Sequence, residues 1–444
     1  MTQPTPAPAD ASRQPSAAPS GWLTAPTHRA WLISQCLELL DFFLPTVDED
    51  GSFVELNDDG VALRAGHPPG EDPRQQLLTV TRAVHCYAIA ELLGVPGAST
   101  IVQRGVTTLW GEHRDAVAGG YFTAVGRGGG AGDTSKTAYG HVHVLLAAAA
   151  ALAAGHQAAA PLLDDALAQI DEHFWSEAAG AMTVEDYDAQ WHEIAPYRGV
   201  NSNMHLCESL LAAAEVTGRS DLAERALRLV AKFIDGHARA HDWLLPEHYD
   251  ASWAPMLEHN HDRPGDPFRP YGATIGHSLE WSRLVLNAGL ASGELSGSLV
   301  EMSQAMFARG VGAGWDRGWG GIVYTVDWDG TPFNRDRYWW PIAEGIATSS
   351  YLLRITSDPV YETWYRRFWD FAASHLLDRE RGGWYAMLDE HGTRKAGPWY
   401  GKPDVYHTLQ AHLLPLLPVA PSLIGAVRRS QYPDQITDME VGSQ

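Results

Sequence analysis

Apolar residues recur at helical spacing along most of the chain between residues 30 and 420. Each run is long enough for a helix, and a short β-type stretch separates successive pairs of runs. The predicted helices that precede a β-type stretch include Ala30–Phe43, Leu222–Gly236 and Tyr361–Leu377. The predicted helices that follow one are Leu77–Leu93, Ala138–Ala153, Asn203–Val216, Ile275–Ala288, Trp340–Ile355 and Val405–Leu417. The pattern therefore predicts a mainly helical protein built from helix pairs.

The β-type stretches occur six times and mark an internal repeat of roughly 60 to 80 residues. They begin at Gly51-Ser-Phe, Gly119-Gly-Tyr, Gly180-Ala-Met, Asp242-Trp-Leu, Gly320-Gly-Ile and Gly382-Gly-Trp. Six helix pairs of this size close naturally into a ring of inner helices surrounded by outer ones. We therefore predict an all-α fold, an (α/α)6 barrel with short β-hairpins at one end. A two-domain chain is the alternative, but no linker-like stretch interrupts residues 30–420.

The ends of the chain differ in composition from the repeats. The first 24 residues are rich in Pro, Ala and Ser and lack the basic start and apolar block of a secretory signal. The last residues are polar and acidic. We predict a disordered leader over residues 1–24, a single barrel domain over residues 25–425 and a flexible tail over residues 426–444.

Charge and cysteine content exclude several classes of partner. The formal net charge of -22 argues against nucleic acid or an anionic membrane surface, since both attract basic proteins. No apolar run approaches the roughly 20 residues of a membrane-spanning helix. Cys36, Cys86 and Cys207 share no motif spacing, so we expect buried free thiols and a cytoplasmic protein. The acidic surface leaves a monomer or a homodimer open.

The stretch Arg198–Leu211 places three polar residues on one face of an otherwise apolar helix. Asn201, His205 and Glu208 follow a spacing of i, i+4 and i+7, so a helix aligns them in one stripe. Such a stripe near the start of a buried helix usually lines a cavity, although a satisfied polar cluster in a core is the alternative.

The other repeats carry polar residues in the same place, near the start of the second helix of each pair. In the barrel these helix starts meet at one end, so the side chains should converge on one pocket. Convergence from six repeats is hard to explain by packing and predicts an active site. The residues are Arg82, His85, Lys136, Tyr139, Asn201, His205, Glu208, His277, Glu280, Trp339, Trp340, Glu344, Lys402, Asp404 and His407.

The residue types suit acid–base chemistry on a sugar. His205/Glu208 and His277/Glu280 are spaced i, i+3, so each carboxylate can lie beside its histidine or share a ligand with it. A helix N-terminus favours neutral histidine, which suits a general base. Asn, Glu, Arg and Lys suit sugar hydroxyls, and aromatic rings suit the apolar faces of a sugar, although most of these tryptophans taken singly are better explained as core. The aromatic candidates are Tyr121, Trp191, Trp253, Tyr271, Trp315, Trp339, Trp340, Trp384 and Tyr406.

Four segments together resemble the N-acylglucosamine 2-epimerase superfamily. They are N-S-N-M-H-L-C-E from Asn201, G-H-S-L-E-W from Gly276, W-W-P-I-A-E from Trp339 and Y-H-T-L-Q from Tyr406. The resemblance covers about residues 28–418. It implies an (α/α)6 barrel enzyme that acts on the open chain of a reducing sugar, with no metal and no cofactor. The segment T-R-A-V-H-C-Y from Thr81 looks closer to the aldose–ketose isomerases of the superfamily than to its epimerases.

The resemblance also implies roles for the site residues. His277 and His407 would be the acid/base pair, and Arg82 would lie beside the carbonyl and enediolate oxygen. Loss of the C2 proton of an aldose leaves a cis-enediolate, whose oxygens need a cation and hydrogen-bond donors. The other residues would bind sugar hydroxyls or orient the histidines, and they are Tyr139, Asn201, His205, Glu208, Glu280, Trp340 and Glu344.

The implied function is an aldose–ketose isomerase for a monosaccharide, with D-mannose and D-fructose as the leading pair. A sugar 2-epimerase of the cellobiose or N-acylglucosamine type and a sulfoquinovose isomerase are alternatives with the same fold. A glycoside hydrolase is a further alternative, because (α/α)6 folds also carry hydrolases. Glu280 and Glu344 could then supply its two carboxylates, but the histidines would be unexplained.

Four other signals carry less weight. Gly126–Gly132 is glycine-rich, but no Gly-Lys-Ser/Thr follows it, so we predict no phosphate site there and assign it no role. Glu258–Asp262 has metal-ligand residue types but lies in a Pro/Gly-rich connection, where a loop closing over the pocket explains it better. His141 and His143 are two apart on a helix and point to different faces. The His-x-x-Glu stripes could hold a divalent metal instead of a sugar, which the resemblance disfavours.

Overall fold

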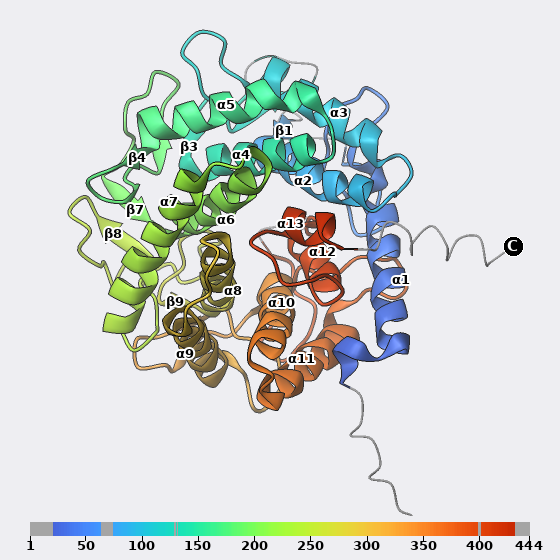
Figure 1. The fold of residues 1–444 in the computed structure, drawn as a ribbon, viewed down its shortest axis with the longest axis vertical. Helices are drawn as coiled ribbons and strands as arrows, with labels where there is room; N and C mark the ends of the chain where they lie inside the picture. The colour runs from blue at the N-terminus through green and yellow to red at the C-terminus, as the bar shows by residue number, and fades with distance from the viewer. Residues whose placement is uncertain (1–20, 64–73, 128–129, 131, 398–400, 431–444) are drawn as a thin grey trace, which may run out of the picture.

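The computed structural model describes residues 21–63, 74–127, 130, 132–397 and 401–430. These residues are mainly helical, and the helices form two concentric rings (Figure 1). The outer helices are α1 (Pro26–Phe43), α3 (Ala98–Thr108), α5 (Ala160–Gln169), α7 (Ser220–Val230), α9 (Gly297–Gly314) and α11 (Pro359–Phe371). The inner helices are α2 (Leu77–Leu92), α4 (Ala138–Ala153), α6 (Val200–Thr217), α8 (Ile275–Ala291), α10 (Trp339–Thr356) and α12 (Tyr406–Leu413). The predicted (α/α)6 barrel is confirmed.

The inner helices form a closed ring. Each contacts the next inner helix along the chain, and α12 contacts α2, which completes the circle. Each outer helix packs on an inner one, α3 on α2 and so on through α11 on α10. The remaining outer helix, α1, packs on α12, so the start of the barrel is joined to its end.

Burial explains which helices lie inside. In α4, every residue of the stretch Val144–Ala151 is buried, as expected for a helix surrounded by protein. In the outer helix α7, Leu222 and Leu229 are buried whereas Asp221 and Glu224 are exposed. This outer helix is therefore amphipathic, with an apolar side toward the barrel and a charged side toward solvent.

Short antiparallel strands hold the N-terminal ends of the inner helices in place. The strand that precedes an inner helix pairs with a strand of the next repeat. These pairs are β1 (Arg74–Gln76) with β2 (Ala124–Gly126), β3 (Lys136–Thr137) with β6 (Asp186–Tyr187), β7 (Tyr197–Gly199) with β8 (His248–Asp250), β9 (Ala273–Thr274) with β10 (Thr325–Val326), and β12 (Arg337–Tyr338) with β13 (Met387–Leu388). β11 (Pro332–Asn334) extends the β9–β10 sheet, and β4 (Trp175–Ser176) pairs with β5 (Ala181–Met182). Before α12, the backbone N–H of Lys402 donates to the carbonyl of Leu56, so this end of the barrel is also closed.

Buried ion pairs fasten three hairpins to the segments that lead into inner helices. In each, an aspartate lies four residues before a glycine pair whose members have positive φ. The pairs are Lys136–Asp115 at 2.9 Å, Arg337–Asp316 at 2.7 Å and Lys402–Asp378 at 2.6 Å. Lys136, predicted to converge on the active site, is therefore turned toward its hairpin instead.

Substitution Asp115→Asn is expected to lower the free energy of unfolding by about 3 kcal/mol, because it leaves a buried ammonium without its carboxylate. The asparagine oxygen can still accept from the backbone N–H groups of Val117 and Ala118, as Asp115 Oδ1 does, so the turn itself keeps its cap. Urea denaturation followed by circular dichroism measures the change. Asp235→Asn is the matched control, because its pair with Arg239 is half exposed on both sides and should contribute little. Equal destabilisation by the two variants would contradict this account.

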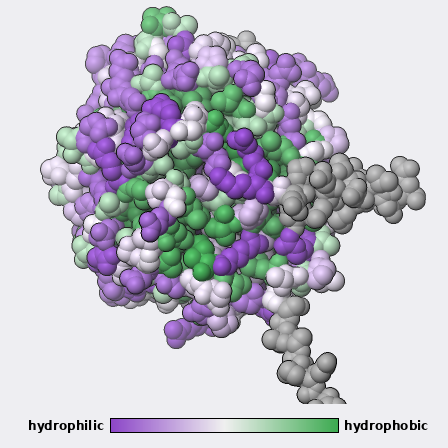
Figure 2. All heavy atoms as spheres, viewed as in Figure 1, coloured by the Kyte–Doolittle hydropathy of each residue, from purple (hydrophilic) through white to green (hydrophobic). Residues whose placement is uncertain are grey.

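The C-terminal segment fills the middle of the ring. α13 (Leu423–Arg428) contacts α2 and α6 and lies inside the circle of inner helices in Figure 1. Asn287 of α8 donates to the carbonyl of Ala420 at 2.7 Å. In the same view, hydrophobic residues gather toward the middle of the face and hydrophilic residues cover much of the rim (Figure 2).

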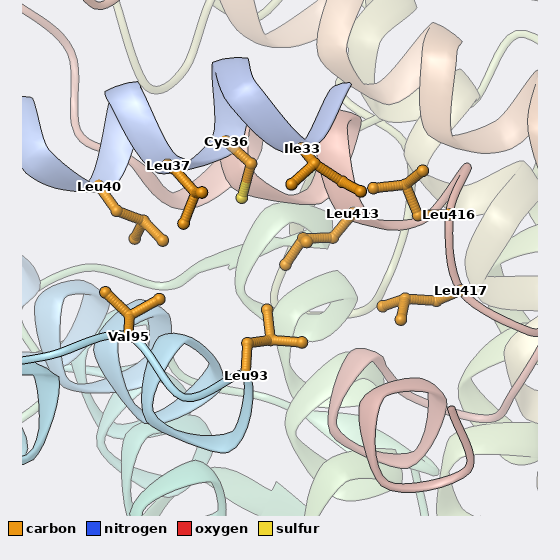
Figure 3. A pocket seen from close by; sticks show the side chains of 9 residues that line it. All are labelled: Ile33, Cys36, Leu37, Leu40, Leu93, Val95, Leu413, Leu416 and Leu417. Atoms are coloured by element: carbon orange, nitrogen blue, oxygen red, sulfur yellow. The ribbon is translucent and has the colours of Figure 1, made fainter. Parts of the chain in front are cut away.

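The three cysteines are free and buried, as predicted. Cys36 lines an apolar cavity of about 20 Å³ between α1, the residues that follow α2 and the end of α12 (Figure 3). A cavity of this size holds at most a water-sized molecule. Among the described helices, none combines the length and the apolar character that crossing a bilayer requires.

Candidate active site

A cavity of about 500 Å³ opens among the N-terminal ends of the inner helices. Pro267 and Phe268 line part of it, and they belong to the same connection as Glu258–Asp262, whose own residues do not line the cavity. Eight of the ten predicted site residues line the cavity, and all six inner helices contribute. They are Arg82 of α2, Tyr139 of α4, Asn201 and His205 of α6, His277 and Glu280 of α8, Trp340 of α10 and His407 of α12.

Two histidines of this cavity are each held by a carboxylate. Nδ1 of His277 lies 2.7 Å from Glu247, and Nδ1 of His407 lies 2.9 Å from Glu344. A carboxylate at this position favours the tautomer with the proton on Nδ1. Nε2 is then the free nitrogen of each ring, and both rings line the cavity. The arrangement provides two oriented groups for general acid–base catalysis.

The indole of Trp340 lies against both histidines. Its ring centroid is 5.0 Å from that of His277 and 5.7 Å from that of His407, with interplanar angles of 36° and 34°. A flat apolar ring in this position suits the C–H face of a sugar whose polar edge meets the histidines.

The guanidinium of Arg82 is fixed by two partners. Nη1 lies 2.5 Å from Asp404, and Nη2 donates to the hydroxyl of Tyr139 at 2.8 Å. The guanidinium carbon also lies 5.0 Å from the ring centre of Tyr406. A cation held so rigidly in a largely buried cavity can stabilise negative charge that develops on a ligand oxygen.

His205 lies behind the Tyr139 hydroxyl and beside Glu208. Its Nε2 is 3.4 Å from the Tyr139 oxygen, its Nδ1 is 3.4 Å from Glu208, and Glu208 also accepts from the hydroxyl of Tyr406. Burial lowers the pKa of His205 to about 4, although the Glu208 charge opposes the shift, so the imidazole is neutral near pH 7. On the same helix, Oδ1 of Asn201 is buried without a hydrogen-bond partner in the described chain, which suits a ligand hydroxyl.

In and directly behind the cavity lining, several carboxylates surround the guanidinium of Arg283, and we call this cluster of Glu208, Glu280, Arg283 and Glu344 the cavity floor. Arg283 donates to Glu344 at 2.9 and 3.2 Å, and its Nη2 lies 3.8 Å from Glu280. Burial raises the pKa of Glu344, but Arg283 and His407 outweigh burial and the net pKa is lowered. Burial and the charge of Glu344 raise the pKa of Glu280 well above its usual range.

Two predictions about pairing and substrate contact are corrected. His277 and Glu280 do not pair as their spacing allowed, because Glu247, from the segment before β8, occupies Nδ1 of His277. Glu208 and Glu344 are absent from the cavity lining, since their oxygens are engaged by His205, Tyr406, Arg283 and His407. Of the two roles left open for these carboxylates, the structure favours orientation of the histidines.

The predicted convergence also included residues that lie outside the cavity. His85 is buried against Tyr406, with 5.6 Å between ring centroids, and does not line the cavity. Of the nine aromatic candidates, only Trp339 and Trp340 line it. Trp191, for example, stacks on His173 at 3.6 Å, and Trp315 packs against Trp364 and Phe368 of α11. Most of these rings are core residues of the hairpins and outer helices.

Sequence reasoning missed several groups that shape the site. Glu247 orients His277, and Tyr324 lines the cavity while its hydroxyl donates to the Pro267 carbonyl at 3.0 Å. Glu247 ends the stretch Asp242-Trp-Leu-Leu-Pro-Glu, which marks the fourth repeat, so its position in the repeat was the available signal. His141 and His143 face different surroundings, as predicted, because Tyr121 contacts the first and His205 the second.

At two places, three possible metal ligands lie within 4.8 Å of one another. One group is His205, Glu208 and Glu280, and the other is Glu280, Glu344 and His407. Glu208 and Glu344 already accept hydrogen bonds from protein groups, so these donor sets fit internal hydrogen bonding better than a metal ion. Part of the Gly126–Gly132 loop, residues 128, 129 and 131, lies outside the described residues, as do residues 1–20 and 431–444 of the predicted leader and tail.

Comparison with known proteins agrees with this geometry. Residues 51–411 match the N-acylglucosamine 2-epimerase (GlcNAc 2-epimerase) family profile. The D-mannose isomerase of Thermobifida fusca is 43% identical over 410 residues, covering 91% of this chain and 98% of that protein. The D-mannose isomerase of Pseudomonas cannabina pv. alisalensis is 40% identical over 413 residues, covering 92% of this chain and 97% of that protein. A crystal structure of D-mannose isomerase superposes with a TM-score of 0.81 at 27% identity, covering 88% of this chain and 99% of that chain. This chain therefore belongs to the N-acylglucosamine 2-epimerase family.

Proposed function

We propose that this protein is an aldose–ketose isomerase that interconverts D-mannose and D-fructose through a cis-enediolate, by histidine acid–base catalysis without a metal. The observation that carries the proposal is the pair of histidine–carboxylate dyads that face one cavity beside a fixed guanidinium. The identity of 40% and 43% to two proteins named D-mannose isomerase supports the choice of substrate. The buried free thiols support a cytoplasmic location.

The proposed reaction moves one proton between C2 and C1 of the open-chain sugar. Nε2 of one histidine, His277 or His407, removes the C2 proton, and the C–H electron pair becomes the C1–C2 double bond. The carbonyl oxygen O1 takes up negative charge, which Arg82 stabilises. Delivery of a proton to C1 and transfer of the O2 hydroxyl proton to O1 then give the ketose. Ring opening beforehand needs an acid and a base at O5 and O1, which the same two histidines can supply.

The remaining cavity residues have binding and positioning roles in this proposal. Trp340 supports the apolar face of the sugar, and Tyr139, Asn201 and His205 bind hydroxyls. Glu208 and Glu344 keep His205 and His407 in place, a role supported by their hydrogen bonds.

Two alternative functions make different demands on the site. A 2-epimerase of the same fold would use the same histidines and return the proton to the other face of C2, so only the product distinguishes it. A glycoside hydrolase would need two carboxylates that reach the scissile bond. Glu344 does not line the cavity, and its oxygens are held by Arg283 and His407, which disfavours hydrolysis.

Chelator-treated protein incubated with D-mannose in heavy water is expected to produce fructose that carries deuterium at C1, because the enediolate takes its proton from a base that exchanges with solvent. Mass spectrometry and nuclear magnetic resonance of the sugars measure both product and label. Glucose formed at a comparable initial rate would indicate an epimerase instead. Activity that requires added metal, or no conversion of mannose, would contradict the proposal.

A further inference from the structure

Glu280 of α8 is fully buried, lines the cavity and has no hydrogen-bond partner within the described chain. Its ion contact with Arg283 is long, 3.8 Å, and the same guanidinium donates two shorter hydrogen bonds to Glu344. A buried carboxylate that accepts no hydrogen bond is costly in its ionised form. The contacts of Glu280 therefore do not supply the hydrogen bonds that an ionised carboxylate requires.

The charges around Glu280 strengthen this conclusion. Glu344 is held as an anion by Arg283 and His407, and Glu208 accepts from Tyr406. The positive charge of Arg82 is balanced by Asp404. A third carboxylate charge on the floor would thus have no cation of its own. The titratable and charged groups that face Glu280 are Arg82 on α2, Tyr139 on α4, His205 and Glu208 on α6, Arg283 on α8, Glu344 on α10, and Tyr406 and His407 on α12.

We propose that Glu280 is a neutral carboxylic acid in the resting enzyme and donates its proton in a hydrogen bond to a substrate oxygen. A neutral donor stabilises the negative charge of an enediolate, whereas an ionised Glu280 would repel it. The donor role rests on the proposed isomerase function, but the protonation state does not. Glu280 is thus a substrate-binding donor that the charge balance of the cavity floor keeps protonated.

Infrared spectroscopy of chelator-treated protein without substrate tests the protonation state. The C=O stretching band of a protonated carboxylic acid is expected near neutral pH and should disappear in Glu280→Gln. Glu185 provides an internal reference, because burial raises its pKa to about 7, so its band should fade as the pH rises through that value and be absent in Glu185→Gln. The Glu280 band should persist above that pH. Absence of any band that Glu280→Gln removes would overturn the proposal.

Kinetics test the donor role. Glu280→Gln keeps a hydrogen-bond donor of the same shape and cannot ionise, so kcat/KM for mannose should stay within about tenfold of wild type. Glu280→Ala removes the donor and should lower kcat/KM by about 100-fold. Circular dichroism establishes that both variants fold. A folded Glu280→Gln variant as inactive as Glu280→Ala would overturn the donor role. If wild-type protein shows no isomerase activity, the proposed function fails while the infrared band still decides the protonation state.

Discussion

Substitution His407→Asn is expected to lower kcat for mannose isomerisation by about 1000-fold, and His277→Asn should have a similar effect. The asparagine amide can replace Nδ1 as a donor to Glu344 or Glu247, so each carboxylate keeps a partner. Neither variant retains a base at the position of Nε2, and proton transfer at C2 or C1 is lost. Fructose formation at saturating mannose measures the change, because saturation separates the chemical step from binding.

His192→Asn is the matched control for these variants. His192 also pairs through Nδ1 with a carboxylate, that of Asp188 at 2.9 Å, but the pair lies at the surface and outside the cavity. This variant should keep the wild-type kcat. Wild-type turnover by either cavity variant would contradict the assignment of that histidine as an acid–base catalyst. In heavy water, mannose that gains deuterium at C2 without forming fructose would identify the mutated histidine as the group that delivers the proton to C1.

The barrel could be predicted because each inner helix has its own apolar pattern and each repeat its own glycine-marked hairpin. Errors arose where the end of an element depends on a local residue. The last inner helix, predicted over Val405–Leu417, ends at Leu413, because Pro415 and Pro418 cannot continue it. The third inner helix begins at Val200 rather than Asn203, since β7 ends at Gly199 and the helix follows directly.

The sequence predicted most of the residues near the helix starts that line the cavity. It did not predict hydrogen-bond partners that come from a distant segment. His277 and Glu280 are three residues apart, so their spacing suggested a pair, but Glu247, 30 residues from His277, makes the hydrogen bond. Lys136 lies two residues before α4, close to a helix start as the true site residues are. The Lys136 side chain is directed by its ion pair with Asp115, 21 residues away, and no local sequence pattern reveals this pair. Partner choice in this fold is therefore set by the pairing of neighbouring repeats.

Substitution Arg82→Gln is expected to lower kcat/KM for mannose by about 100-fold or more, chiefly through kcat. The guanidinium interacts more strongly with the substrate oxygen once that oxygen becomes negative, so its loss affects the transition state more than the bound aldose. Arg82→Lys keeps the charge but cannot contact Asp404 and Tyr139 with two nitrogens at once, so it should recover only part of the activity. Steady-state kinetics with mannose, with kcat and KM determined separately, measure the effect.

Arg114→Gln separates this effect from the loss of any arginine in a salt bridge. Arg114 likewise pairs with a carboxylate, Asp165 at 2.8 Å, and lies 4.7 Å from the centre of the Trp110 ring, but it is outside the cavity. It should keep wild-type kcat/KM even if its stability falls. A folded Arg82→Gln variant with raised KM and unchanged kcat would show that Arg82 binds ground state and transition state equally. The negative charge of the enediolate would then have to be met by other donors of the cavity, among them the Tyr139 hydroxyl and the proposed neutral form of Glu280.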